Sequence, residues 1–187
     1  MTVGLLGGTF DPPHNGHVAL ARAAVEQLGL DRLVVLVVAH PGHREVSAPA
    51  EARLRLAQAA FRAIPSTEVE LDGHARTVDL LREGRWRDPL FLVGADEFAG
   101  FLSWKEPEEV LALARLGVAT RPGYPREQVE RVLAELRHPE RVVLFEIPPV
   151  AVSSSMLRRS ISGGERIDSL VPPAVAELVS ELDLYRR

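Results

Sequence analysis

The sequence contains no cysteine and, among its 187 residues, a single lysine, Lys105. Without cysteine there can be no disulfide framework, no thiolate metal site and no thiol nucleophile. With one lysine, the cations that hold an anionic ligand must come mainly from arginine and histidine. The formal net charge of −4 argues against a surface that binds duplex nucleic acid.

Long apolar runs are also missing. The stretch from Leu33 to Ala39 is too short to cross a bilayer, and no charged and apolar signal segment precedes Val3. We therefore expect a cytoplasmic protein with neither a membrane nor a nucleic acid as partner, and a homo-oligomer stays open. Hydrophobic residues make up 46% and charged residues 26%, so the chain can form one ordinary globular domain.

Apolar runs alternate with amphipathic ones along most of the chain. The runs that predict strands are Val3–Leu6, Leu33–Val38, Glu68–Leu71, Leu90–Val93, Leu116–Ala119 and Val142–Ile147. The segments that predict helices between them are Gly16–Leu28 with Gly29 as C-cap, Ala50–Ile64, Thr77–Glu83, Glu106–Ala114 and Pro125–Arg137. This order predicts an α/β fold with a doubly wound parallel sheet, covered by helices on both faces.

The pattern changes after Ile147, where two prolines interrupt it. Ser153–Ser162 then predicts a short serine-capped helix, and Pro172–Leu182 predicts another helix with proline at its start. We expect one domain over residues 1–187, with a sheet core at 1–147 and a small helical extension at 148–187. The extension should pack at one edge of the sheet and complete the functional site.

The most informative segment joins the first strand to the first helix and reads Gly-Gly-Thr-Phe-Asp-Pro-Pro-His-Asn-Gly-His, from Gly7 to His17. Ligands of open α/β sheets bind at this end of the strands. Glycines allow a phosphate to approach the backbone, and Asn15 as N-cap would place His17 in the first helical turn, where free N–H groups favour an anion. His14 and His17 are three residues apart, so both rings can face one point above the helix end.

A second segment combines hydroxyls with a guanidinium, in the order Ser153-Ser154-Ser155-Met156-Leu157-Arg158. Hydroxyls at a helix N-terminus, with an arginine one turn later, are typical of an anion site. An ordinary serine N-cap is the alternative interpretation.

The Gly7–His17 segment resembles the G-G-T-F-D-P-x-H-x-G-H signature of the nucleotidyltransferase superfamily and, more narrowly, of bacterial nicotinate-nucleotide adenylyltransferases. The serine-rich segment resembles their I-S-S-T-x-I-R motif, with Ser155 for Thr and Leu157 for Ile. The resemblance implies a Rossmann-like fold and adenylyl transfer from ATP to nicotinate mononucleotide, giving deamido-NAD and pyrophosphate in NAD biosynthesis. It also implies Mg²⁺ bound through the ATP phosphates.

The same resemblance implies roles for individual residues. His14 and His17 would be catalytic. The residues expected at ATP are Gly7, Gly8, Thr9, Phe10, Arg44, Gly94, Asp96, Ser154, Ser155 and Arg158. The residues expected at the acceptor nucleotide are Thr77, Arg76, Trp104 and Arg121.

Three departures from the family pattern bear on these roles. Arg44 stands where the family has lysine in a mobile P-P-H-K loop, and Ala39-His40 stand where it has asparagine. Ala75-Arg76 replace the Ser-Tyr of an S-Y-T segment that holds the pyridine carboxylate, so Arg76 would have to take over that contact. Dual specificity for nicotinate and nicotinamide mononucleotides therefore stays open.

Other functions fit parts of the pattern. Phosphopantetheine adenylyltransferase shares the H-x-G-H motif but normally has Gly-Ser-Phe-Asp in the preceding turn. A metallohydrolase could use His14 and His17 as ligands, although a convincing third ligand is missing. A non-catalytic regulator would bind ATP without releasing pyrophosphate. Because no covalent nucleophile is evident, direct in-line displacement, catalysed by positioning and charge neutralisation, fits the sequence best.

Overall fold

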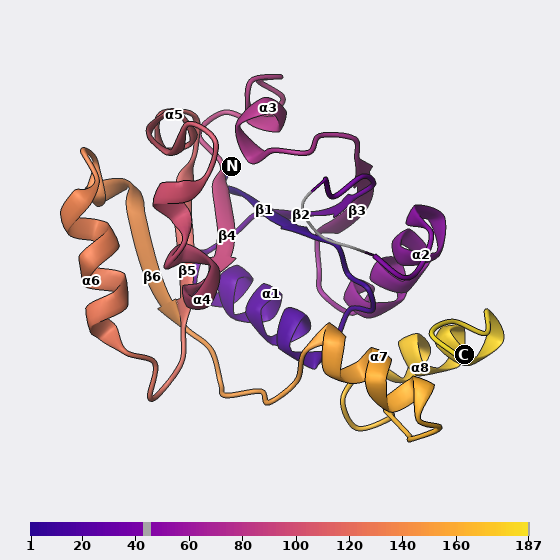
Figure 1. Cartoon of the computed structure of the whole chain (residues 1–187). Helices are drawn as coiled ribbons and strands as arrows, with labels where there is room; N and C mark the ends of the chain where they lie inside the picture. Colours follow the sequence, from indigo (N-terminus) through magenta and orange to yellow (C-terminus); the bar gives the residue numbers. More distant parts are fainter. Residues whose placement is uncertain (43–45, 187) are drawn as a thin grey trace.

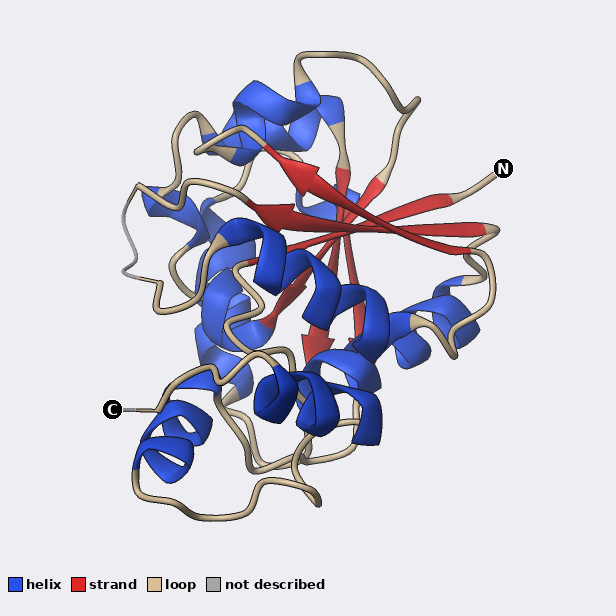
Figure 2. Cartoon of the chain, turned by 90° about the vertical axis from the view of Figure 1, so that its right-hand side faces the viewer, coloured by secondary structure: helices blue, strands red, loops and turns tan. Residues whose placement is uncertain are grey.

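One parallel six-stranded sheet forms the centre of the computed structural model, which describes residues 1–42 and 46–186. Its strands are β1 (Val3–Gly8), β2 (Arg32–Val38), β3 (Thr67–Asp72), β4 (Leu90–Gly94), β5 (Arg115–Thr120) and β6 (Val142–Glu146). The strand order is β3-β2-β1-β4-β5-β6, with every neighbouring pair parallel. The sheet is strongly twisted, as the fan of strands in Figure 2 shows.

The inner strands are apolar over most of their length because both faces of the sheet are covered. Successive side chains point to opposite faces, so Leu5 joins one buried cluster and Leu6 the other. In β2, Val35 and Val37 lie in the cluster of Leu6, whereas Val34 packs with Leu5. Two apolar cores therefore form, one on each face of the sheet.

Helices divide between these two faces (Figure 1). On the face of Leu6 lie α1 (Asn15–Leu28) and α2 (Ala50–Phe61), together with α7 (Ser154–Ser162) and α8 (Pro173–Glu181) from the tail. On the opposite face lie α3 (Thr77–Leu81), α4 (Ala95–Phe98), α5 (Pro107–Leu113) and α6 (Arg126–Glu135). Short 3₁₀ turns occur at Phe101–Ser103 and Pro139–Arg141.

The strand order reverses direction between β1 and β4. From β1 the chain builds outward through β2 to β3, then crosses to β4 and builds outward on the other side. Loops at the carboxyl ends of β1 and β4 consequently diverge, and in open α/β sheets the ligand binds in the crevice they leave. The Gly7–His17 segment leaves β1 at this position.

The predicted α/β fold is confirmed, and every predicted strand and helix lies within a few residues of its observed counterpart. Gly29 ends α1 in the left-handed region, at φ 60°, as a C-cap glycine does. One detail was wrong: His14, not Asn15, is the N-cap of α1, and the amide of Asn15 donates to the carbonyl of Ser169 instead. In the tail, α8 packs against α2, which in turn packs on β3 and β2.

Within the described residues, no helix is long and apolar enough to span a membrane.

Candidate active site

Aromatic rings occupy the space beside the two glycines that end β1. A Cβ on Gly8 would lie 2.9 Å from the ring of Phe10, and a Cβ on Gly7 would lie 3.2 Å from the ring of Phe91. Phe10 is itself buried and meets the ring of His17 edge to face, with centroids 5.1 Å apart. The glycines thus admit these rings, and Phe10 in turn supports a histidine of the motif.

The two histidines of the motif stack on each other at the start of α1. Their ring centroids are 3.7 Å apart and their planes differ by 19°. A Cβ on Gly16 would lie 3.0 Å from Nδ1 of His14, so this position has little room for a side chain. The H-x-G-H spacing therefore lets the backbone of the first helical turn pass closely beside the first ring.

Hydrogen bonding and burial set the state of both rings. The backbone N–H of His14 donates to Nδ1 of His17 over 3.2 Å, so in neutral His17 the proton is on Nε2. Burial lowers the pKa of His14 to about 4. Burial, and secondarily the charge of His14, lowers the pKa of His17 well below its ordinary value. Both rings are consequently neutral near pH 7 without ligand, and His17 can offer its Nε2–H to an anion.

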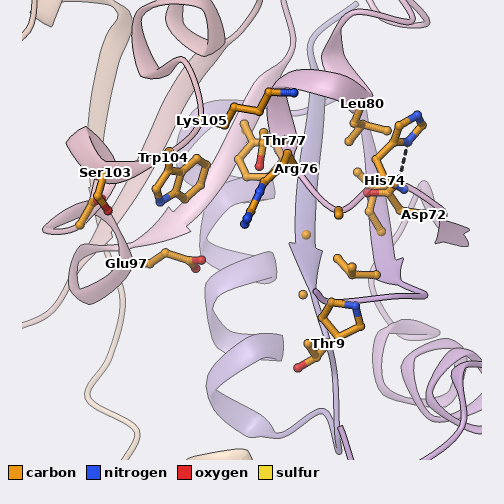
Figure 3. A pocket seen from close by; sticks show the side chains of 18 residues that line it. Thr9, Asp72, His74, Arg76, Thr77, Leu80, Glu97, Ser103, Trp104 and Lys105 are labelled. Carbon is orange, nitrogen blue, oxygen red and sulfur yellow. Dashed lines mark hydrogen bonds and ion pairs between the residues drawn. The ribbon is translucent and has the colours of Figure 1, made fainter. Parts of the chain in front are cut away.

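A cavity of about 740 Å³ opens at the carboxyl ends of β1 to β4 (Figure 3). It contains six of the predicted residues: Gly7, Gly8, Thr9, Arg76, Thr77 and Trp104. Other lining side chains include Asp72, His74, Glu97 and Lys105. In Figure 3, Trp104 and Glu97 lie on one side, His74 lies on the other, and Arg76 extends between them.

Polar and charged side chains in this cavity are held by hydrogen bonds and close polar contacts. Nδ1 of His74 lies 2.8 Å from Oδ1 of Asp72, and its Nε2 lies 3.3 Å from Glu83. The ammonium of Lys105 lies 2.8 Å from Asp79. The cavity can therefore present both signs of charge beside an aromatic face. Neither His74 nor Lys105 belongs to a sequence motif, and sequence reasoning gave them no role.

A second cavity, of about 710 Å³, lies beside α7. Its lining includes the predicted Ser155 and Arg158, and also Ser47, Arg159, Ser162, Gly163, Tyr185 and Arg186. Ser153 caps the helix by accepting from the backbone N–H of Met156, as predicted. The hydroxyl of Ser154 donates to the carbonyl of Pro12 over 2.8 Å. Arginines and serines thus surround this cavity.

Contacts between α7 and the first loop join the two predicted motifs, which are about 140 residues apart. Besides the Ser154 contact, the guanidinium of Arg158 donates to the carbonyl of Asp11 over 2.7 Å. The Gly7–His17 segment therefore lines the first cavity at its start and touches the wall of the second farther along. The two histidines lie in the last part of the same segment.

Sequence reasoning missed Arg53, which is fully buried. Its guanidinium donates to four backbone carbonyls, those of Ala48 (3.0 Å), Thr9 (2.9 Å), Val38 (2.7 Å) and Ala39 (3.0 Å). It thereby ties the turn after β1 to the end of β2 and to the start of α2. Nothing in the sequence distinguishes it from Arg55, the exposed arginine of the same helix.

Several predicted residues lie elsewhere. Asp96 and Arg121, expected at different substrates, form an exposed ion pair 3.1 Å long, and neither lines either of these cavities. Gly94 ends β4 with open space at its Cβ position. Arg44 falls outside the described residues. Over residues 1–42 and 46–186, no three His, Asp or Glu side chains form a group that could hold a metal ion.

A family model and two relatives point to the same family, and both relatives align with the whole of this chain. A family model described as "Cytidylyltransferase-like" matches residues 5–160. A protein of Thermus thermophilus, named "Probable nicotinate-nucleotide adenylyltransferase", is 39% identical over 195 residues and covers 100% of both chains. A protein of Rubrobacter xylanophilus with the same name is 36% identical over 201 residues, covering 100% of this chain and 92% of its own.

Solved structures agree in fold. Plasmodium falciparum nicotinic acid mononucleotide adenylyltransferase superposes with TM-scores of 0.79 in its complex with NaAD and 0.77 in its complex with APC. The sequence identities are 17% and 16%, and 98% of this chain and 97% or 96% of the other are covered. At such identities the superposition supports the fold alone.

Proposed function

The chain belongs to the nicotinate-nucleotide adenylyltransferases, within the cytidylyltransferase-like family, and from this membership we propose that it transfers the adenylyl group of ATP to nicotinate mononucleotide. The products are deamido-NAD and pyrophosphate, in NAD biosynthesis. The observation that best supports this function is the pair of cavities joined by the Gly7–His17 segment. One is flanked by an aromatic face and suits a base or pyridine ring, and the other is lined by arginines and serines and suits phosphates.

We place the triphosphate of ATP at the second cavity, against Ser155 and Arg158, with Arg44 as a further cation. Ser154 holds the first loop through Pro12, because its hydroxyl donates there. We propose that the backbone of Gly7, Gly8, Thr9 and Phe10 approaches the nucleotide, and that the pyridine ring of the acceptor lies in the first cavity, under Trp104 and beside Thr77 and Arg76. Gly94 and the Asp96–Arg121 ion pair line neither cavity. We propose that Gly94 and Asp96 contact the adenosine, and Arg121 the acceptor phosphate, where the substrates extend beyond the cavities.

The reaction is then a direct in-line displacement. A phosphate oxygen of the acceptor attacks the α-phosphorus of ATP, and the bond from that phosphorus to the bridging oxygen breaks, so that pyrophosphate leaves with the electron pair. His17 donates Nε2–H to the α-phosphoryl oxygens, where negative charge changes most, and His14 supports it by stacking and through its backbone N–H. Catalysis is thus positioning and electrostatic stabilisation.

Adenylyl transfer from ATP uses a divalent cation, and we propose that it is Mg²⁺. The described residues offer no carboxylate cage for it. Mg²⁺ commonly keeps several waters and binds through substrate phosphates, so the ATP phosphates, not protein carboxylates, would hold it here.

The choice of acceptor depends on a carboxylate in place of a neutral amide. Backbone N–H groups near Thr77, with the guanidinium of Arg76, favour the anion and would leave the amide NH₂ facing donors. A buried unpaired polar contact costs about 1–3 kcal/mol, so we expect roughly ten- to hundredfold higher kcat/KM for nicotinate mononucleotide than for the nicotinamide analogue. Arg76→Ala should narrow this ratio.

A pyrophosphate-release assay with ATP, Mg²⁺ and a panel of acceptors tests these proposals. Release with nicotinate mononucleotide supports the function, whereas release only with phosphopantetheine would reassign the acceptor. ATP binding without release under any condition would indicate a regulator. Comparable kcat/KM for the two pyridine mononucleotides would refute the acceptor preference and leave adenylyl transfer intact.

A further inference from the structure

The carboxylate of Asp11 links three distant parts of the chain. It is 2% exposed and accepts three hydrogen bonds. Oδ2 accepts from the backbone N–H of Ser47 over 2.6 Å. Oδ1 accepts from the backbone N–H of Ala48 over 3.1 Å and from the hydroxyl of Tyr185 over 2.8 Å. The loop before α2 and the segment after α8 are therefore both fastened to the turn after β1.

The same residue also holds Arg158. One guanidinium nitrogen donates to the backbone carbonyl of Asp11 over 2.7 Å and lies 3.9 Å from its Oδ2. Ser47, Arg158 and Tyr185 all line the second cavity. Three of the four residues that donate a hydrogen bond to Asp11 therefore belong to the wall of the proposed triphosphate site, and the fourth, Ala48, follows Ser47 in the chain.

We propose that Tyr185 is a positioning residue for ATP: through its hydrogen bond to Asp11 it keeps Arg158 and the backbone at Ser47 and Ala48 in place for the triphosphate. This proposal rests on the proposed function, since it assumes that the second cavity receives the β and γ phosphates. It assigns Tyr185 a role in substrate binding without direct contact with the reacting atoms.

The Tyr185 hydroxyl influences Arg158 because both groups can donate to the carboxylate of Asp11. The Tyr185 hydroxyl occupies a lone pair of Oδ1, and burial raises the pKa of Tyr185, so the group stays a donor throughout the working pH range. Without that donor, a buried carboxylate would draw on the nearest cation that can move. Arg158 is partly exposed and only 3.9 Å away, so it would turn toward Asp11 and away from the cavity.

Arg53, the other arginine near Asp11, is not the cation that would move toward the carboxylate. It lies close enough to Asp11 for the carboxylate to raise its pKa, against the larger effect of burial. Its guanidinium, however, is bound to four backbone carbonyls, and it is fixed inside α2. Arg158 is therefore the cation that responds to a change at Tyr185.

Tyr185→Phe tests the proposal, because it removes one hydroxyl and keeps the ring. We expect KM for ATP, and Kd for Mg·ATP measured by calorimetry without acceptor, to rise about tenfold, which corresponds to about 1.4 kcal/mol. KM for nicotinate mononucleotide and Kd for AMP should change less than about twofold, because neither ligand has β or γ phosphates. The calorimetric stoichiometry for AMP counts the folded sites, so loss of fold is not mistaken for loss of affinity.

Ser160→Ala is the matched control. It also removes a hydroxyl that donates to a carboxylate, that of Glu165 over 2.6 Å, and it lies in the same tail without lining the second cavity. Its ATP affinity should equal that of the wild type. In an Asp11→Asn background, Tyr185→Phe should have little further effect, because the proposed route passes through the Asp11 carboxylate.

Three results would overturn the proposed role of Tyr185. Unchanged ATP affinity in Tyr185→Phe, or equal weakening of ATP and AMP, would overturn the proposal. So would an undiminished Tyr185→Phe effect in the Asp11→Asn background. Failure of the proposed function is separately visible, because the wild-type protein would then release no pyrophosphate from ATP and nicotinate mononucleotide.

Discussion

Replacing Arg53 by methionine should destabilise the protein far more than the same replacement of Arg55, the other arginine in α2. Methionine keeps the length and apolar stem but removes the guanidinium that serves four carbonyls. Thr9, Val38, Ala39 and Ala48 would lose a charged donor, and the buried Asp11 would lose a neighbouring cation.

The loss of unfolding free energy in Arg53→Met is the difference between two opposing contributions. A hydrogen bond to a charged group contributes about 1.5–3 kcal/mol, so four would suggest a very large loss. Removing a buried charge also relieves its desolvation cost, and breaking such an arrangement typically costs about 3–5 kcal/mol net. At about 2–4 °C per kcal/mol for a chain of this size, we expect Tm to fall by about 10 °C.

Urea unfolding followed by circular dichroism measures the free energy of unfolding directly. Arg55→Met is the control, since Arg55 lies in the same helix, is half exposed and pairs loosely with Glu181 at 3.7 Å. It should cost less than about 1 kcal/mol. Arg53→Lys should fall between the two, because an ammonium cannot reach all four carbonyls. If Arg53→Met were within about 1 kcal/mol of Arg55→Met, the carbonyl contacts would not hold the three segments together as argued.

Three further predictions concern the site. His17→Ala should lower kcat about 10²–10³-fold with little change in ATP affinity, and near-normal turnover at saturating substrates would refute its role. Arg158→Ala and Ser155→Ala should weaken ATP more than AMP in calorimetry, whereas equal weakening would place the serine-rich motif elsewhere. Because burial lowers the pKa of His14 to about 4 while the unfolded value is about 6.5, the unfolded chain binds more protons between these values. Stability should therefore fall by about 3 kcal/mol as pH drops through that window, and His14→Gln should abolish this part of the pH dependence in urea titrations.

Local patterns accounted for most of what the sequence could predict. The apolar run from Leu33 to Val38 is a buried strand, and Gly29 ends a helix, as predicted. Both predictions needed only the residues themselves and their neighbours in the sequence. The first motif was placed correctly at the end of β1 for the same reason. Its N-cap was assigned one residue too late, because Asn15 is the better intrinsic cap but is engaged by Ser169.

Contacts made at long range were beyond such reasoning. Arg53 looks like any arginine on an amphipathic helix until the turns after β1 and β2 are seen to converge on it. The sequence also does not reveal that Asp96, just after β4, and Arg121, just after β5, form an ion pair. His74 and Lys105 carry no motif, yet they line the first cavity.

The hydrogen bond between Tyr185 and Asp11 also bears on how the protein folds during its synthesis. The two residues are separated by 174 positions, so a ribosome can synthesise all six strands before the hydroxyl that completes this contact emerges. The sheet can assemble from contacts between nearby segments, but closing so long a loop requires the chain up to Tyr185. A nascent chain released before this point would hold its Rossmann-like sheet and its two histidines, while the wall beside Arg158 lacked one of its fastenings.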